Sequence, residues 1–254
     1  MKALLLGLVL SCGLGLCACR KQAEKPHRTE PWLAHPEASA SVHGAGGLAP
    51  RELHVTPESR VRFKLVGRKG QVSGSAPVSE GTVRLDPSDL TRSSASLSVD
   101  LSALSVDAAD NAPSNVSPRE TALEWLELGP EVAADKREQF RFARFELTAI
   151  DGGSGRALVW GGHKLPPQRV TAVGTLLLHG FRAPVRTDVV LSVMPGNAGP
   201  ELSIRSGATL VLPLAPHDIG PRGPGGVVDA VETARAKEAL GGSVRLELEL
   251  IARP

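Results

Sequence analysis

The feature that most constrains this chain is an alternation of apolar and polar residues that recurs from residue 51 onward. It is clearest near the end of the sequence, where Val244, Leu246 and Leu248 alternate with Arg245 and Glu247. In a β-strand every second side chain points to the same side, so such a segment buries one face and exposes the other. The alternation therefore predicts half-buried β-strands.

Several further segments show the same alternation, and turn-forming sequences such as Asp86-Pro87-Ser88 separate them. Together they indicate eight or nine antiparallel strands. That number fits either a closed barrel or a two-sheet sandwich, and the alternation alone does not distinguish the two. The alternating segments lie at residues 61–66, 83–86, 97–102, 145–149, 176–178 and 185–193.

Two segments break the alternation and are predicted to be helices. Residues 120–128 space their leucines as a helix does and stop at Gly129-Pro130. Residues 229–240 are rich in Ala, Glu, Lys and Arg and stop at Gly241-Gly242, a sequence typical of a helix end. We therefore expect an all-β fold of about eight strands with one or two short helices.

The first 18 residues have the character of a lipoprotein signal peptide. After Lys2 comes an almost unbroken apolar run that is too short to span a bilayer as a finished helix but suits a secretory signal. The run ends in Leu16-Cys17-Ala18-Cys19, which resembles the lipobox of bacterial lipoproteins. That resemblance implies cleavage before Cys19 and acylation of its thiol, with palmitate among the acyl chains. The alternative is an ordinary signal peptide cleaved elsewhere, which leaves a free thiol.

The residues after Cys19 predict a location and a tether. No Asp follows the cysteine, and this absence favours the outer membrane, with the protein facing the periplasm. Residues 19–50 are rich in Ala, Pro, Gly, His and charged residues without a hydrophobic period, which indicates a flexible tether. We therefore expect a signal peptide at 1–18, a tether at 19–50 and a barrel domain at 51–254, held at the membrane by its lipid anchor.

Composition and motifs exclude several classes of function. Lys and Arg (29) nearly balance Asp and Glu (27), and they are scattered, which argues against a nucleic-acid partner. The chain has no phosphate-binding glycine loop and no G-x-S-x-G elbow. The tether histidines His27, His35 and His43 lie too far apart in a segment without regular structure to form a metal site. We expect no catalytic residue, no metal site and no cofactor other than a bound ligand.

Short motifs in a fixed order carry a resemblance to a known family. Residues 173–185 read VGTLLLHGFRAPV, residues 57–63 place a Ser before an apolar-x-Phe sequence, and residues 217–220 read HDIG. These motifs and their order resemble the YceI-like polyisoprenoid-binding family, over roughly residues 53–252. By the same resemblance, residues 72–86 form a hairpin.

The resemblance implies an extended, lipocalin-like antiparallel barrel in the periplasm with a long apolar cavity. Some members of the family hold a polyisoprenoid chain such as a ubiquinone or a polyprenyl lipid. Here Ala76 stands about where the family has a phenylalanine. The expected partners are therefore a long-chain isoprenoid or similar lipid and the membrane. The side chains expected to line the cavity are Val61, Phe63, Leu65, Leu97, Val99, Leu101, Phe145, Leu147, Leu176, Leu178, Leu246 and Leu248.

Alternatives to lipid binding stay open. The same apolar side chains could fill an ordinary core, which would leave a structural or interaction barrel without a ligand. A hydrolase or isomerase acting on a lipid lacks any nucleophile–base pair visible in the sequence. His179 lies at the corner between a strand and a turn, where a structural hydrogen bond is favoured over catalysis or metal binding. A homodimer is also compatible with the sequence.

Overall fold

The computed structural model describes residues 49–107, 117–152, 158, 160, 166–196, 199–223 and 226–254. The expected signal peptide, Cys19, the tether histidines and the tether itself up to residue 48 lie outside these ranges, so these assignments stay predictions. Among the described helices, none combines the length and the apolar character needed to cross a membrane.

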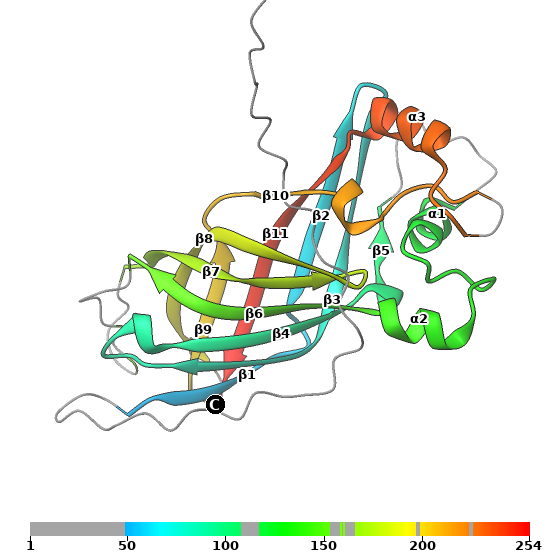
Figure 1. Ribbon diagram of the computed structural model, residues 1–254. Helices are drawn as coiled ribbons and strands as arrows, with labels where there is room; N and C mark the ends of the chain where they lie inside the picture. Colours follow the sequence, from blue (N-terminus) through cyan, green and yellow to red (C-terminus); the bar gives the residue numbers. More distant parts are fainter. Residues whose placement is uncertain are drawn as a thin grey trace, which may run out of the picture.

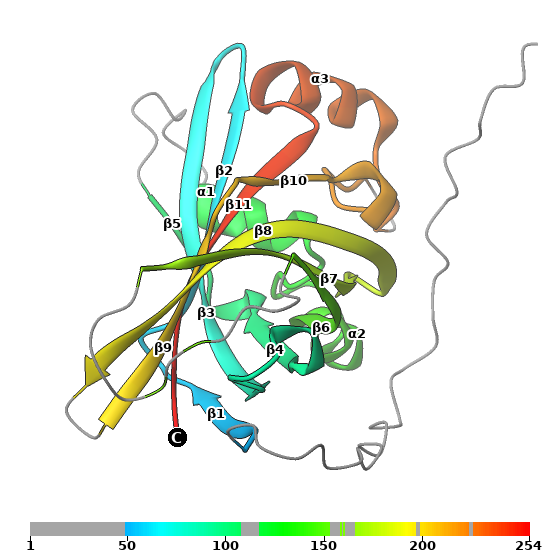
Figure 2. The same cartoon turned by 90° about the vertical axis from the view of Figure 1, so that its left-hand side faces the viewer.

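Eight antiparallel strands form a closed ring, and Figures 1 and 2 show these strands from two directions. Going round the ring, the order is β11, β2, β3, β4, β6, β7, β8 and β9, and β9 pairs again with β11. This last pairing selects the barrel over the sandwich and confirms the all-β prediction. The ring strands are β2 (Arg60–Gly67), β3 (Gly70–Leu85), β4 (Ser94–Asp100), β6 (Phe142–Asp151), β7 (Gln168–Leu178), β8 (Phe181–Gly196), β9 (Gly199–Ser206) and β11 (Ser243–Arg253).

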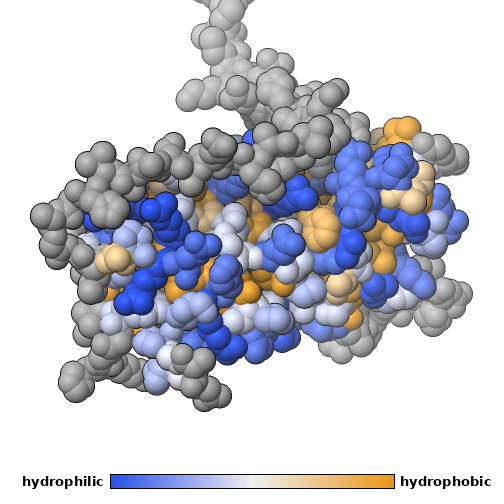
Figure 3. Space-filling view, turned by 90° about the horizontal axis from the view of Figure 1, so that it is seen from below, coloured by the Kyte–Doolittle hydropathy of each residue, from blue (hydrophilic) through white to orange (hydrophobic). Residues whose placement is uncertain are grey.

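Three short strands extend the wall of the ring. Strand β1 (Arg51–Val55) lies beyond the end of β2, where it pairs with both β3 and β11. Strand β10 (Leu210–Pro213) pairs with the first half of β11, and β5 (Ser105–Val106) pairs with β3. On the face seen in Figure 3, hydrophilic side chains prevail with hydrophobic ones between them, in keeping with the outer faces of half-buried strands.

Residues 72–86 do not form the expected hairpin. Residues 72–85 lie on the single strand β3, which pairs with β2 through its first half and with β1 through its last residues. The register with β4 shifts between Val78 and Glu80, and an irregularity of this kind bends a strand. A bent strand that changes partners has the same local sequence pattern as two strands joined by a turn, so the prediction was wrong at this point.

The structure describes three α-helices, one more than the largest number expected. Helix α1 (Pro118–Trp125) and helix α3 (Ala230–Leu240) correspond to the two predicted helices. The Asp229 carboxylate caps α3 by accepting hydrogen bonds from two backbone N–H groups of its first turn. Helix α2 (Ala134–Phe140) was not predicted, because Phe140 is its single large apolar residue and the segment shows no hydrophobic period.

Three 3₁₀ turns complete the described elements: η1 (Leu90–Arg92), η2 (Leu101–Ala103) and η3 (Ala215–His217). Leu101, expected at the end of a strand, instead begins η2, because the Asp100 carboxylate accepts a hydrogen bond from the Ser102 N–H and turns the chain. Figure 1 shows α1 and α2 together at one side of the barrel, and α3 beside the tip of the β2–β3 hairpin.

The apolar interior is packed unequally along the barrel. One cluster contains Leu53, Leu90, Leu202 and Ala252, whose side chains are fully buried. A second cluster, which contains Leu178, consists largely of half-buried side chains contributed by strands, loops and the end of α1. Side chains are therefore buried more completely in the first cluster than in the second, which is the looser part of the interior.

Because Leu90 is fully buried in the packed cluster, its replacement by alanine should leave a void there. We expect Leu90→Ala to lower the free energy of unfolding by about 3 kcal/mol. Urea denaturation followed by circular dichroism measures this. Val211→Ala, at a strand residue whose side chain is exposed, is the control and should cost less than about 1 kcal/mol. Equal losses in the two variants would contradict the assignment of Leu90 to the packed end.

Candidate functional site

A cavity runs through the interior of the barrel and is lined by side chains from all eight ring strands and from α1. The volume open to the centre of a water-sized molecule is about 290 Å³. A single water needs roughly 10–15 Å³ on this measure, so the cavity is far larger than the voids of a packed core. It is therefore a chamber inside the barrel.

The wall of the cavity is apolar. Among its lining residues in the described part of the chain, only Ser93, Arg144 and Thr187 carry a hydroxyl or a charge. Ser93 accepts a hydrogen bond from the Asp86 N–H, so its hydroxyl is already engaged. A ligand inside the cavity would consequently meet hydrocarbon along most of its length, and a buried charge there would have almost no partner.

The structure places all twelve residues of the predicted set on the cavity wall. That they contact a ligand stays a prediction. The sequence did not identify the wall residues that lie outside the alternating segments. These additional residues include Ala122, Trp125 and Leu126 around the end of α1, and Leu214 and Ile219 around η3.

Two glycines of the barrel lie directly against aromatic rings of the cavity wall. Gly74 is the cross-strand partner of Phe63, and a Cβ atom at Gly74 would lie 2.5 Å from the Phe63 ring. A Cβ atom at Gly174 would likewise lie 2.5 Å from the Phe145 ring. Each ring thus occupies the space that a side chain on the neighbouring strand would take. Ala76, where the family resemblance leads one to expect a phenylalanine, is buried and leaves further space.

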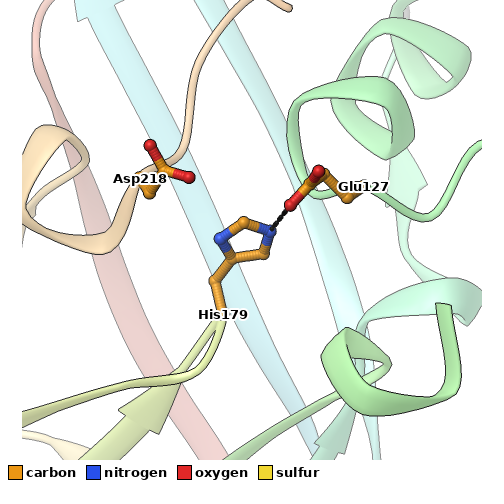
Figure 4. A group of neighbouring side chains, drawn as sticks. All are labelled: Glu127, His179 and Asp218. Carbon is orange, nitrogen blue, oxygen red and sulfur yellow. Dashed lines mark ion pairs between the residues drawn. The ribbon is translucent and has the colours of Figure 1, made fainter. Parts of the chain in front are cut away.

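A group of charged side chains lies at the looser part of the barrel, and we call it the mouth cluster: Glu127, Lys136, His179, Asp218 and Arg222. The His179 Nε2 lies 3.2 Å from Glu127 Oε2, and the Arg222 Nη2 lies 3.6 Å from the same oxygen. Arg222 also pairs with Asp218 through Nη1 at 3.1 Å, and Lys136 pairs with Glu127 through Oε1. Figure 4 shows that three of these side chains converge from three separate segments.

The backbone of the mouth cluster is unusual. Glu127, His179 and Asp218 have φ angles of 54°, 51° and 55°. In the described ranges these are the non-glycine residues with positive φ. Such a conformation costs roughly 1–3 kcal/mol per residue and persists where the surrounding structure holds it in place. The three residues with this left-handed backbone conformation are also the three whose side chains meet in Figure 4.

His179 makes the structural hydrogen bond predicted from its position at the turn. Its Nδ1 lies 3.0 Å from the His217 carbonyl oxygen, which can only accept, so Nδ1 carries the ring proton. Burial lowers the pKa of His179, and the negative charge of Glu127 and the hydrogen bond to His217 raise it by less. Burial also lowers the pKa of His217, whose ring forms a hydrogen bond with the Leu178 backbone.

The mouth cluster contains metal-ligating side chains, since Glu127, His179 and Asp218 bring ligand atoms within 4.8 Å of one another. Two cations, however, already lie against the two carboxylates. Lys136 and Arg222 balance their charge, so a divalent ion would add two uncompensated positive charges to a largely buried group. We therefore interpret the cluster as a charge-balanced structural group. Sequence analysis missed Glu127, because its partners lie far away along the chain.

The two buried histidines predict a dependence of stability on pH. Their pKa values are lowered in the folded protein, so below about pH 6.5 the unfolded chain takes up protons that the folded chain does not. The free energy of unfolding should therefore decrease as the pH is lowered, by at most about 1.4 kcal/mol per pH unit for each histidine. His217→Gln should reduce this slope, while replacing the exposed His54 by Gln serves as the control. Urea denaturation between pH 7.5 and 5.5 measures the slopes, and equal slopes for His217→Gln and the wild type would contradict the assignment.

Two solved structures are similar to this chain, whereas no family model and no curated protein matches it. One is a polyisoprenoid binding domain from Saccharophagus degradans implicated in plant cell wall breakdown. It is 16% identical with a TM-score of 0.47, over 80% of this chain and 97% of that one. The other is BcnA from Burkholderia cenocepacia, 14% identical with a TM-score of 0.44, over 76% of this chain and 96% of that one.

A polyisoprenoid binding domain is thus among the structures to which this chain is similar. The architecture itself rests on the strand pairing of the chain.

Proposed function

We propose that this protein binds a long, uncharged apolar chain of the isoprenoid type in its barrel cavity, and that it sequesters or carries that lipid. The observation that carries the proposal is the cavity itself, which is enclosed by all eight ring strands and lined almost wholly by hydrocarbon. Removing apolar surface from water yields about 25 cal/mol per Å². An extended isoprenoid tail offers much such surface with little polarity to satisfy.

The lining also indicates which part of a ligand enters. A charged head group inside the cavity would lose its hydration without gaining a counter-ion, at a cost of several kcal/mol. The tail therefore enters, and a polar head such as a quinone or an alcohol stays near the looser part of the barrel, where the half-buried residues lie. Branched methyl groups of an isoprenoid suit an aliphatic wall of Leu, Val and Ala side chains.

We further propose that the protein works at a membrane. The expected acylation of Cys19 would hold it there, in the periplasm and at the outer membrane. A tether of some thirty residues has a reach of roughly 30 Å as a random coil, which would keep the barrel next to the bilayer. A carrier of a membrane-soluble lipid would then stay beside its source.

The competing interpretation is a barrel whose core is filled and which binds nothing. Two valines on strands separate the two interpretations, because Val99 lines the cavity and Val211 is exposed. Tryptophan at position 99 should occupy the space of the ligand, whereas Val211→Trp adds the same group outside the barrel. Overpacking at Val99 should cost about 1–3 kcal/mol of stability without unfolding the barrel.

We expect the wild type to bind geranylgeraniol, a neutral isoprenoid alcohol. In native mass spectrometry Val99→Trp should bind it at least about tenfold more weakly, while Val211→Trp should bind it as the wild type does. Circular dichroism checks that both variants fold. Failure of the wild type to bind geranylgeraniol, together with the absence of any lipid extracted from protein purified from its native membrane, would support the filled barrel. Unimpaired binding by Val99→Trp would contradict the cavity as the site.

A further inference from the structure

The segment of residues 117–141, which we call the cap, covers part of the cavity. It contains α1 and α2, and Ala122, Trp125 and Leu126 of this segment belong to the cavity wall. Helix α1 nevertheless has no fully buried residue. The buried apolar side chains of the cap, Leu128 and Phe140, lie after α1. A helix that covers a cavity without burying a side chain of its own depends on contacts of the neighbouring residues to stay in place.

Two contacts tie the ends of the cap to one side of the barrel. Near its start, the Arg119 guanidinium donates a hydrogen bond to the Ser102 carbonyl at 2.8 Å, beside η2. At its end, Arg141 pairs with Asp100 at 2.8 Å, where β4 runs into η2. Both contacts lie at η2, so they fix the two ends of the cap and leave its middle to be held by something else.

Glu127 lies in the middle of the cap and connects it to the opposite side of the mouth. Its carboxylate pairs with the Arg222 guanidinium in the loop after η3 and lies beside the His179 ring at the β7–β8 turn, whose proton is on the other nitrogen, Nδ1. The side chains of Glu127, His179 and Arg222 are 6%, 1% and 7% exposed, so these are contacts between groups withdrawn from water. The Phe140 ring, at the end of α2, packs on the His179 ring with centroids 4.1 Å apart.

Each of the three left-handed residues of the mouth cluster is a chain neighbour of a cavity-wall residue. Holding those three backbones in place therefore also fixes three apolar side chains around the mouth. The pairs of neighbours are Leu126 and Glu127, Leu178 and His179, and Asp218 and Ile219.

We propose that the mouth cluster is a latch, in which Glu127 is the positioning residue that holds the cap over the cavity. Opening of the latch sets the rate at which the lipid enters and leaves. This inference rests on the proposed function. A latch that is closed both with and without ligand raises the barrier to both directions of exchange, so weakening it speeds entry and exit by the same factor. The dissociation constant then changes little, unlike the effect of damaging the cavity wall.

Trp125 offers a reporter for the test, because it lies in the cap and lines the cavity. In a background with Trp32→Phe and Trp160→Phe, its fluorescence should be quenched when decylubiquinone, the probe, enters the barrel. Stopped-flow mixing gives the association rate constant, and displacement by excess geranylgeraniol gives the dissociation rate constant. The variant Glu127→Gln keeps the shape of the side chain and removes its charge. Glu124→Gln, at an exposed glutamate in the last turn of α1 and three residues before Glu127, is the matched control.

We expect Glu127→Gln to raise both rate constants by about tenfold and to change the dissociation constant by less than about threefold. Glu124→Gln should exchange the probe at the rate of the wild type. Unchanged rate constants in Glu127→Gln would overturn the latch while leaving the proposed function intact. Absence of quenching in an equilibrium titration of the parent protein would instead overturn the proposed function.

Two further measurements keep the latch testable on the wild-type protein. Hydrogen–deuterium exchange should show the amides of the cap exchanging faster than those of β7 and β8, and equal protection would overturn the proposal even if Glu127→Gln failed to fold. EDTA should leave the exchange of decylubiquinone unchanged. A faster exchange with EDTA that Zn²⁺ reversed would assign the cluster to a metal ion and would overturn the charge-balanced latch.

Discussion

The pairing of β9 with β11 is the interaction on which the rest of this structure depends, because it turns a bent sheet into a ring. Without it both strands would be exposed edges, open to association with other strands. With it, every second side chain of eight strands faces one interior. A ring of this size encloses room for one elongated ligand if the side chains do not fill it. The size and polarity of the interior thereby become the properties that decide what the barrel can do.

Small residues and close packing divide that interior into two parts with different roles. Because Gly74 and Gly174 carry no side chain, the Phe63 and Phe145 rings lie close against the neighbouring strands and form part of the cavity wall there. An empty lumen forgoes packing energy, at a cost that grows with its volume. The packed cluster around Leu90 compensates by burying side chains completely. Leu202 of this cluster also lines the cavity, whereas Leu53 and Leu90 do not. The barrel can hold a chamber because side chains such as Leu53 and Leu90 are packed as in an ordinary core.

Features of the fold and the site could be predicted from sequence where they depend on neighbouring residues, and not where they depend on residues far apart along the chain. The alternation is local, so it identified segments of seven of the eight ring strands and the inward-facing side chains from Val61 to Leu248, while β9 (Gly199–Ser206), which closes the ring, was not identified. The single strand over residues 70–85 was missed, because a bend with a change of partner looks like a turn when the partners are unknown. The mouth cluster was missed for a related reason. Glu127, His179 and Arg222 meet only in the folded chain, and nothing near Glu127 in sequence marks it as a partner of a histidine.

The chemistry of the mouth explains why an ion pair, in addition to the packing of Phe140 on His179, would fasten the cap over a lipid. An apolar seam between the cap and the barrel would present the same surface as the ligand, so a lipid tail could replace it from inside. The Glu127 carboxylate held by the Arg222 guanidinium offers nothing that a hydrocarbon can replace. The other two ion pairs lie within the two sides of the mouth, because Lys136 pairs with Glu127 inside the cap and Asp218 pairs with Arg222 in the segment after η3. The Lys136 and Asp218 side chains are 40% and 47% exposed, so the charges that flank the crossing pair face solvent. A latch of this kind resists replacement by its own cargo.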